Sequence, residues 1–268
     1  MSAPTYFGSA AVPADNVLNA STQITITPPA SMQAGDLVVV VCHSRASATW
    51  SNGVTGGQTW TAETAYQSSA AGAFCRIFWC TFTGTWAASP RFDSTSGTIT
   101  SAFMHVFRPD STSKIWGIDV AQATTQFAAP TTPFTVTRAG LTNVNADTVT
   151  LACFHSGDDN TWGSMSGTGW VLTGSAQYRN AVVANQTSAT FAHHLDGPAG
   201  SVVPSVSKNQ ATLGGDAGVT AIIAFYALRL AGSASQPMSR MTLPGRTARA
   251  WGLTGPKPLG IRASLATG

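Results

Sequence analysis

The sequence has 268 residues, of which only 9% are charged, and this composition excludes a mainly helical protein. Eleven arginines and three lysines stand against ten aspartates and a single glutamate. Glutamate and lysine, which usually cover helix surfaces at little entropic cost, total four residues. A hydrophobic content of 43% is enough to build a core, so a globally disordered chain is excluded as well.

Short segments rich in β-branched and aromatic residues alternate with stretches of Gly, Ser, Asn and Pro. This alternation predicts strands over residues 23–27, 36–44, 73–83, 98–108, 134–138, 147–155, 177–185 and 218–230. Many short strands with no helical segment between them are typical of a β-sandwich or barrel. We therefore predict an all-β protein.

Landmarks of the first half recur in the second half in the same order. The matched pairs are Asp36 and Asp147, Cys42 and Cys153, Trp50 and Trp162, and Trp60 and Trp170, at offsets of 111, 111, 112 and 110. This recurrence predicts two jelly-roll-like β-sandwich repeats, at residues 20–129 and 130–231, after an N-terminal strand or arm at residues 1–19. The pattern leaves open whether they form one fused sandwich or two separate ones.

Residues 232–268 show neither strand alternation nor a helical period, and four prolines interrupt them. The segment has five basic residues and no acid, whereas residues 1–231 hold nine bases and eleven acids. Such a segment forms no core of its own, so we predict an extended basic arm that binds a neighbouring surface. The predicted contact residues of this arm are Arg240, Arg246, Arg249, Trp251, Lys257 and Arg262.

Two apolar runs, residues 37–42 and 221–228, are far shorter than the roughly 18–20 residues of a membrane-spanning helix. Residues 1–4 show no basic segment leading into an apolar core, so we expect no signal peptide and no membrane partner. A chain that folds in a cytoplasm keeps its thiols reduced. We therefore expect the four cysteines to be free and buried.

The sequence contains no G-x-S-x-G, P-loop, G-x-G-x-x-G or H-E-x-x-H motif. A single glutamate, Glu63, excludes a glutamate pair as general acid and base, and Asp158-Asp159 is typical of a turn. No C-x-x-C or H-x-x-x-H spacing points to zinc. We therefore predict no enzyme activity, no catalytic residues, no metal ligands and no cofactor.

The histidines and tryptophans have structural and functional interpretations. Residues His43, His105 and His155 fall in predicted strands, where core or interface positions are expected, and His193-His194 precedes a predicted turn, where one of the pair would face solvent. The paired Trp50 and Trp162 either close the open end of a sandwich as buried side chains or stack a sugar ring at the surface. The first interpretation is preferred.

The segments Thr5-Tyr6-Phe7-Gly8-Ser9-Ala10, Thr25-Ile26-Thr27 and Ala34-Gly35-Asp36-Leu37-Val38-Val39-Val40, followed by Gly57-Gln58-Thr59-Trp60, resemble β-sandwich structural proteins of tailed bacteriophage virions. The resemblance covers about residues 3–230. It implies a non-enzymatic part of the virion and supplies no site residues.

Within a virion, the expected role is an accessory capsid or decoration protein that contacts other virion proteins, and copies of itself, through the basic arm. Alternatives are a tail, neck or baseplate component, or a carbohydrate-binding receptor module that contacts a host-surface glycan. The body of the chain is slightly acidic and offers no basic groove, so nucleic acid is not an expected partner.

Overall fold

The computed structural model describes residues 3–68, 72–97, 99–112, 114–128, 134–159, 161–180, 186–196, 198–210 and 217–229. These residues form twenty β-strands and no helix, which confirms the prediction of an all-β protein. They all belong to one compact unit, Met1–Leu230. The predicted arm, with its six contact residues, lies outside the described residues. Within the described part of the chain, no helix is long and apolar enough to cross a membrane.

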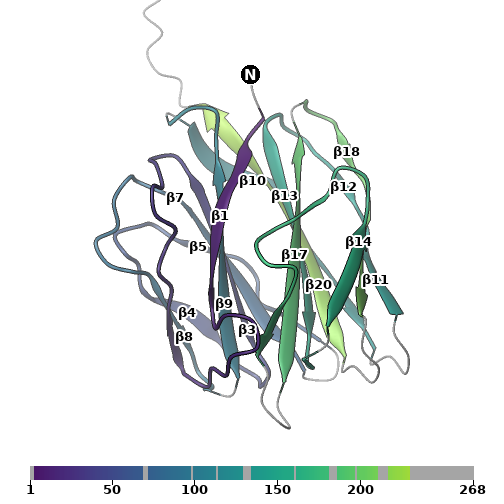
Figure 1. The fold of residues 1–268 in the computed structure, drawn as a ribbon. Coiled ribbons are helices and arrows are strands. Elements are labelled where there is room, and N and C mark those ends of the chain that lie inside the picture. The colour runs from purple at the N-terminus through teal and green to yellow at the C-terminus, as the bar shows by residue number, and fades with distance from the viewer. Residues whose placement is uncertain are drawn as a thin grey trace, which may run out of the picture. The chain divides into compact units, whose positions relative to one another are not determined.

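The first half of the chain forms a large and a small antiparallel sheet (Figure 1). The large sheet has the order β1-β9-β3-β7-β5, and β6 also pairs with β7. Its strands are β1 (Thr5–Val12), β3 (Leu37–Ser44), β5 (Thr61–Ala62), β6 (Tyr66–Gln67), β7 (Phe74–Thr81) and β9 (Thr100–Arg108). The small sheet, β2-β8-β4, consists of β2 (Gln23–Thr25), β8 (Arg91–Ser94) and β4 (Trp50–Val54).

The second half forms another such pair of sheets. Its large sheet has the order β10-β20-β13-β17-β15, with β16 also paired to β17. These strands are β10 (Lys114–Phe127), β13 (Thr148–Ser156), β15 (Val171–Leu172), β16 (Tyr178–Asn180), β17 (Thr187–Asp196) and β20 (Gly218–Arg229). The small sheet has the order β11-β19-β14, with β11 (Phe134–Arg138), β14 (Trp162–Ser166) and β19 (Val206–Gln210). A further two-stranded ribbon joins β12 (Leu141–Thr142) to β18 (Val202–Val203).

The two halves have the same strand order once their strands are matched in sequence. The first large sheet, β1-β9-β3-β7-β5, corresponds to β10-β20-β13-β17-β15, and β2-β8-β4 corresponds to β11-β19-β14. In each half most successive strands alternate between the large and the small sheet, as in a jelly roll. The superposition of residues 20–109 on residues 131–229 stays a prediction.

The boundary between the halves differs from the one expected from the sequence. Strand β10 was expected to belong to the repeat at residues 20–129, but it pairs with β20 in the second large sheet. Likewise β1, expected in a separate segment at residues 1–19, is an edge strand of the first large sheet and pairs with β9. Both are half-exposed edge strands without strict alternation, so their sequences gave no signal of which sheet they join.

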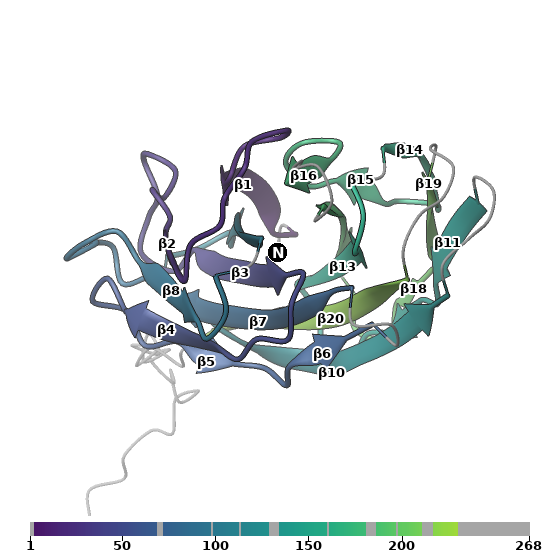
Figure 2. The same cartoon turned by 90° about the horizontal axis from the view of Figure 1, so that it is seen from below.

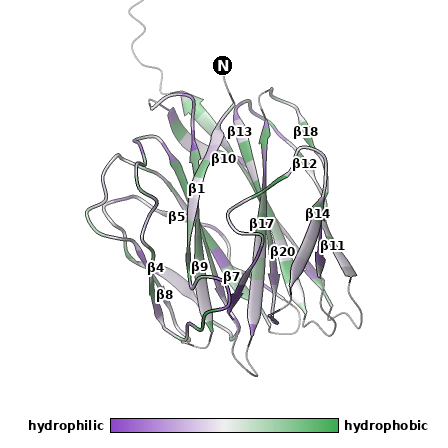
Figure 3. Cartoon of the chain, in the orientation of Figure 1, coloured by the Kyte–Doolittle hydropathy of each residue, from purple (hydrophilic) through white to green (hydrophobic). Residues whose placement is uncertain are grey.

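The sheets stack in four layers, with the two large sheets back to back in the middle and a small sheet at each end (Figure 2). All eight residues of β3 and all nine of β13 are buried, because each large sheet is covered on both faces. In Figure 3 hydrophobic residues concentrate along long strands such as β20, whereas β14 of a small sheet is paler.

Three clusters of side chains fill the spaces between the layers. The central layer, between the two large sheets, includes Val39, Val41, Cys75, Phe103, Leu151, Cys153, Phe191 and Phe225. The first outer core lies under the small sheet β2-β8-β4 and includes Ile24, Val40, Cys42, Trp50, Cys80 and Phe92. The second outer core lies under β11-β19-β14 and includes Val136, Ala152, Phe154, Trp162, Val206 and Ile222.

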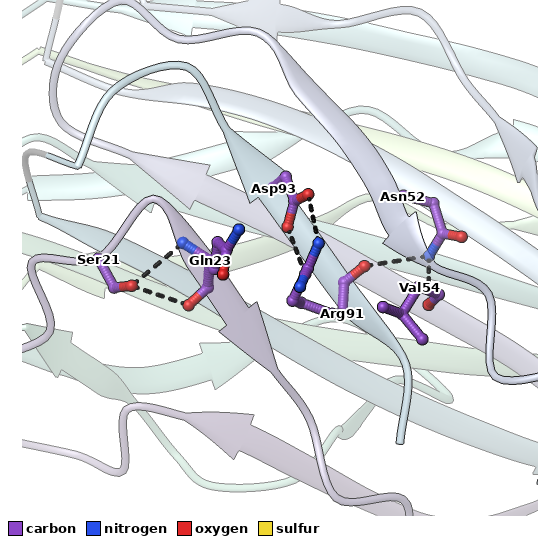
Figure 4. A network of polar contacts seen from close by, with 6 residues as sticks. All are labelled: Ser21, Gln23, Asn52, Val54, Arg91 and Asp93. Carbon is purple, nitrogen blue, oxygen red and sulfur yellow. Dashed lines mark hydrogen bonds and ion pairs between the residues drawn. The ribbon is translucent and has the colours of Figure 1, made fainter. Parts of the chain in front are cut away.

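The outward face of the small sheet β2-β8-β4 is polar (Figure 4). The guanidinium of Arg91 donates to both carboxylate oxygens of Asp93 at 2.8 and 3.0 Å. On β4, Asn52 is the cross-strand partner of the buried Phe92 and so lies on the inner face, where its amide donates to the carbonyl of Arg91 at 3.3 Å. The outward face of β8 carries the ion pair of Arg91 with Asp93.

All four cysteines are free and buried, as predicted. The expected match of Cys42 with Cys153 is nevertheless wrong for the sheet faces, because Cys42 points into the first outer core and Cys153 into the central layer. An offset of 112 pairs residues that face the same kind of layer, namely His43 with His155 and Trp50 with Trp162. An offset of 111 differs from this by one residue, and because side chains alternate along a strand, it pairs residues on opposite faces.

Candidate functional site

Two histidines and a cysteine that could bind a metal ion lie close together in the buried central layer. His43, Cys75 and His155 each offer a ligand atom, and these atoms all lie within 4.8 Å of one another. His43 on β3 and Cys75 on β7 are cross-strand partners in the first large sheet. His155 comes from β13 in the opposite sheet, and we call these three residues the His–Cys cluster.

Two more polar side chains adjoin the cluster. The hydroxyl of Tyr66 lies 3.1 Å from Nε2 of His155, and Tyr66 is also the cross-strand partner of Cys75. Cys153 lies two residues before His155 on β13 and therefore shares its face of the sheet. Cys153, Cys75 and Tyr66 all pack in the central layer.

The imidazoles of the cluster have unused hydrogen-bonding capacity. Among the described residues, neither ring nitrogen of His43 has a hydrogen-bond partner, and neither does Nδ1 of His155. The two rings contact each other edge to face, with centroids 4.9 Å apart. Each buried polar group without a partner lowers the free energy of unfolding by about 1–3 kcal/mol. The cluster therefore destabilises the folded state unless another group binds these nitrogens.

Burial controls the protonation of the cluster. It lowers the pKa of His43 to about 3, with a further contribution from the nearby charge of Arg45. Burial, followed by His43 and His105, lowers the pKa of His155 well below its usual value. The pKa of the Cys75 thiol and that of the Cys153 thiol are raised, again chiefly by burial. At neutral pH the group therefore consists of neutral imidazoles and neutral thiols.

A surface pocket of about 250 Å³ borders the cluster. Its lining includes the exposed residues Ser47, Thr49 and Gln67 and the buried residues Tyr66 and Cys75. His43 and His155 are not part of this lining.

The other two histidines of the central layer lie apart from this cluster. His105 contacts the ring of Phe191, with centroids 4.5 Å apart, and its two nitrogens have no partner among the described residues. His193 stacks on Tyr6 and its Nδ1 lies 2.8 Å from the hydroxyl of Thr173. Contrary to expectation, His193 and His194 lie within β17 and not before a turn, because the strand continues to Asp196.

The structure places Trp50 and Trp162 in the two outer cores, with 1% and 3% of their surface exposed. The indole of Trp162 donates to the hydroxyl of Ser188 at 3.0 Å, whereas Nε1 of Trp50 is buried and has no partner in the part of the chain that the structure describes. A buried ring offers no face to a sugar, so the sugar-platform hypothesis has no support at either position. Their burial agrees with the preferred interpretation.

Short sequence spacings gave no sign of the His–Cys cluster, because its members come from three strands in two sheets. The one available signal was the recurrence of a strand histidine, His43 and His155, at an offset of 112. Nothing in the sequence indicated that Cys75 would join them.

Comparisons with known proteins add no further constraint: no protein-family model, curated protein or solved structure matches the chain.

Proposed function

We propose that the chain is a non-enzymatic structural component of a bacteriophage particle, an accessory capsid or decoration protein that docks on other virion proteins through residues 232–268. The observation that carries the proposal is the fold itself, with the same strand order twice in one compact unit. A protein that works by packing needs a rigid body of this kind and few surface charges.

The positions of the histidines, thiols and charged residues support this role. The histidines and thiols of the described residues are buried or nearly so, whereas the visible outward faces carry hydroxyl, amide and paired charged groups. The positive charge of the sequence is concentrated in residues 232–268, which include Trp251. Tryptophan and arginine contribute most to interface energies, so this segment is the part of the chain suited to anchor it.

The proposal is tested by binding to particles of the phage that carries the gene, assembled from a mutant that lacks it. Labelled full-length protein should sediment with these particles. Full-length Trp251→Ala, and the double variant Arg246→Ala with Arg249→Ala, should bind at least about tenfold more weakly, because each loses an interface anchor. The matched control Arg91→Ala, which removes an arginine on a small sheet, should bind normally.

Two outcomes would overturn the proposal. If the wild-type chain fails to sediment with the particles, the virion role is wrong. If the arm variants bind as well as the wild type, docking does not depend on residues 232–268. Gold labelling of the bound chain distinguishes a head position from the alternative of a tail, neck or baseplate position.

A further inference from the structure

We propose that the central layer holds one thiophilic d10 metal ion, for which Zn²⁺ is the probe, bound by His43, Cys75, His155 and Cys153. The site goes beyond the proposed structural role and does not depend on it. It also departs from the sequence-based expectation that the chain has no metal ligands.

The geometry of the His–Cys cluster is close to that of a bound site. Zinc bonds of about 2.0–2.1 Å to nitrogen and 2.3 Å to sulfur place tetrahedral ligand atoms roughly 3.3–3.8 Å apart. The ligand atoms of His43, Cys75 and His155 already lie within 4.8 Å of one another. A shift of about 1 Å or less in each of these three side chains therefore brings their ligand atoms to tetrahedral spacing.

Charge balance in the dry central layer identifies the fourth ligand. Zn²⁺ with two imidazoles and one thiolate would leave a net positive charge buried among apolar side chains, which is costly. A second thiolate makes the site neutral, and Cys153 is the other cysteine that the described residues place in the central layer, on the same strand face as His155. Binding then releases two protons, one from each thiol, and the two sulfur–zinc bonds replace the two S–H bonds.

Tyr66 is suited to position one of the ligands. If its oxygen accepts the proton of Nε2 of His155, the lone pair of Nδ1 stays free, and Nδ1 is the nitrogen without a hydrogen-bond partner. Such an outer hydrogen bond fixes the tautomer and the ring orientation of a metal-binding histidine. Tyr66 is therefore a positioning residue and not itself a ligand.

The site would join the two halves of the chain. Its ligands come from β3 and β7 of the first large sheet and from β13 of the second. A metal bound between them crosslinks the two sandwiches and engages nitrogens that have no other partner in the described residues.

The first experiment measures bound metal on the full chain. The protein is prepared under reducing conditions without a metal-affinity tag, loaded with Zn²⁺, desalted and analysed by mass spectrometry for zinc. About one equivalent per chain is expected in the wild type, and less than about 0.2 equivalent in Cys75→Ser and His43→Asn. Cys80→Ser and His105→Asn, which alter an equally buried thiol and imidazole outside the cluster, should keep about one equivalent.

A second readout keeps the test decisive if a ligand variant fails to fold. Co²⁺ loaded in place of Zn²⁺ should give a thiolate-to-cobalt charge-transfer band in the wild type and in His105→Asn. In Tyr66→Phe the band should persist while metal affinity falls by about 10- to 100-fold, as for loss of an outer-shell hydrogen bond. Circular dichroism confirms that each variant compared is folded.

Three results overturn the proposal: a wild-type chain that retains no zinc and shows no cobalt band, zinc retained equally by folded Cys75→Ser, or a disulfide between Cys75 and Cys153 that forms in preference to metal binding.

Discussion

The ring of His43 meets the ring of His155 edge to face, with centroids 4.9 Å apart, although the two residues are 112 positions apart and belong to different sheets. The same offset relates Tyr66 to Tyr178, both of which lie in the central layer. In an assembly with a twofold axis, a residue touches its own counterpart only near that axis.

Contacts at the two ends of the large sheets are also related by an exchange of the two halves of the chain. At one end Tyr6 of β1 stacks on His193 of β17, with centroids 5.1 Å apart. At the other end the backbone N–H of Trp116 on β10 donates to the hydroxyl of Thr81 on β7 at 3.0 Å. Since β10 corresponds to β1 and β7 to β17, exchanging the two halves exchanges these contacts.

We therefore expect residues 20–109 to superpose on residues 131–229 after a rotation of close to about 180°, as in an isologous pair. His43 should fall on His155 and Trp50 on Trp162. An experimental structure checks this directly. A superposition that instead places Cys42 on Cys153, or that requires a different strand order, contradicts the prediction.

Replacing Lys114 with methionine should destabilise the protein by about 3 kcal/mol, because removing one partner of a buried ion pair leaves the others uncompensated. Only 1% of the Lys114 side chain is exposed, and its ammonium lies 2.7 Å from carboxylate oxygens of both Asp110 and Asp147. Urea denaturation measures the change in the free energy of unfolding.

The matched control for this prediction is Arg91→Met, which breaks the pair with Asp93. Both of these side chains are about 30% exposed. A surface pair contributes only about 0–1 kcal/mol, so the control should change stability little. Equal losses in the two variants would contradict the burial argument.

Lys208→Met should raise the free energy of unfolding at pH 7 by about 1–3 kcal/mol, since an apolar side chain of similar length replaces a buried cation. The Lys208 side chain is fully buried and its ammonium donates to the carbonyl of Gly163 at 3.0 Å. Its cross-strand partner is Met165, which packs on the second outer core, so methionine suits this environment.

The pH dependence of this gain has a definite sign. Burial lowers the pKa of Lys208, so the folded state binds its proton less tightly than the unfolded state. The cost of burying Lys208 therefore grows as pH falls below about 10.4, the usual lysine value. The advantage of Lys208→Met should shrink as pH is raised from 7 toward 10, and a constant difference would contradict this account.

His105→Leu should stabilise the protein by about 2 kcal/mol more at pH 5 than at pH 7.5. Burial, with a contribution from His193, lowers the pKa of His105 to about 3. Between about pH 6.5 and pH 3, His105 is therefore protonated in the unfolded chain but neutral in the folded chain. The free energy of unfolding of the wild type consequently falls as the pH drops through this range. A leucine at this position cannot be protonated in either state. It also removes the two ring nitrogens of His105, neither of which has a hydrogen-bond partner among the described residues.

Urea denaturation at pH 7.5 and pH 5 tests this prediction. Each buried histidine of this kind contributes up to about 1.4 kcal/mol per pH unit, so the slope of stability against pH should become shallower in the variant. An unchanged slope would show that His105 does not titrate differently in the two states.

Trp162→Phe should cost about 1 kcal/mol more than Trp50→Phe, although the two tryptophans are equally buried. Trp162 loses a hydrogen bond to Ser188, and the serine hydroxyl is left without its donor. Trp50→Phe removes an indole N–H that has no partner among the residues the structure describes. Parallel denaturation curves measure the difference, and a larger loss for Trp50 would contradict the hydrogen-bond argument.

The central strands could be predicted from the sequence because few secondary structures other than a buried strand fit their residue types. Strand β3 is a nearly continuous run of apolar residues, β13 combines apolar residues with β-branched threonines, and both lie in the middle of large sheets. Strand β10 was missed because its exposed half, rich in Thr, Gln and Ala, contains no run of this kind. Its position is fixed by pairing with β20, a contact about a hundred residues away in the chain.

The His–Cys cluster was harder to predict for a different reason. A local spacing can place two ligands on one strand or turn, but here the register of β3 against β7 and the stacking of two sheets bring the groups together. Matching Cys42 with Cys153 by sequence position pairs side chains on opposite faces of their sheets, because a shift of one residue along a strand moves a side chain to the other face.

The two small sheets at the ends of the stack have the same strand order but unlike surfaces. On β8 the outward groups include the ion pair of Arg91 with Asp93, whereas β11 and β19 present hydroxyl and amide groups, as in the contact of Thr135 with Asn209 at 2.6 Å. A dimer of identical sandwiches would have to display one surface twice. Because both sandwiches are encoded in one chain, their outward surfaces need not share a sequence, and the two ends of the stack present different side-chain chemistry to their surroundings.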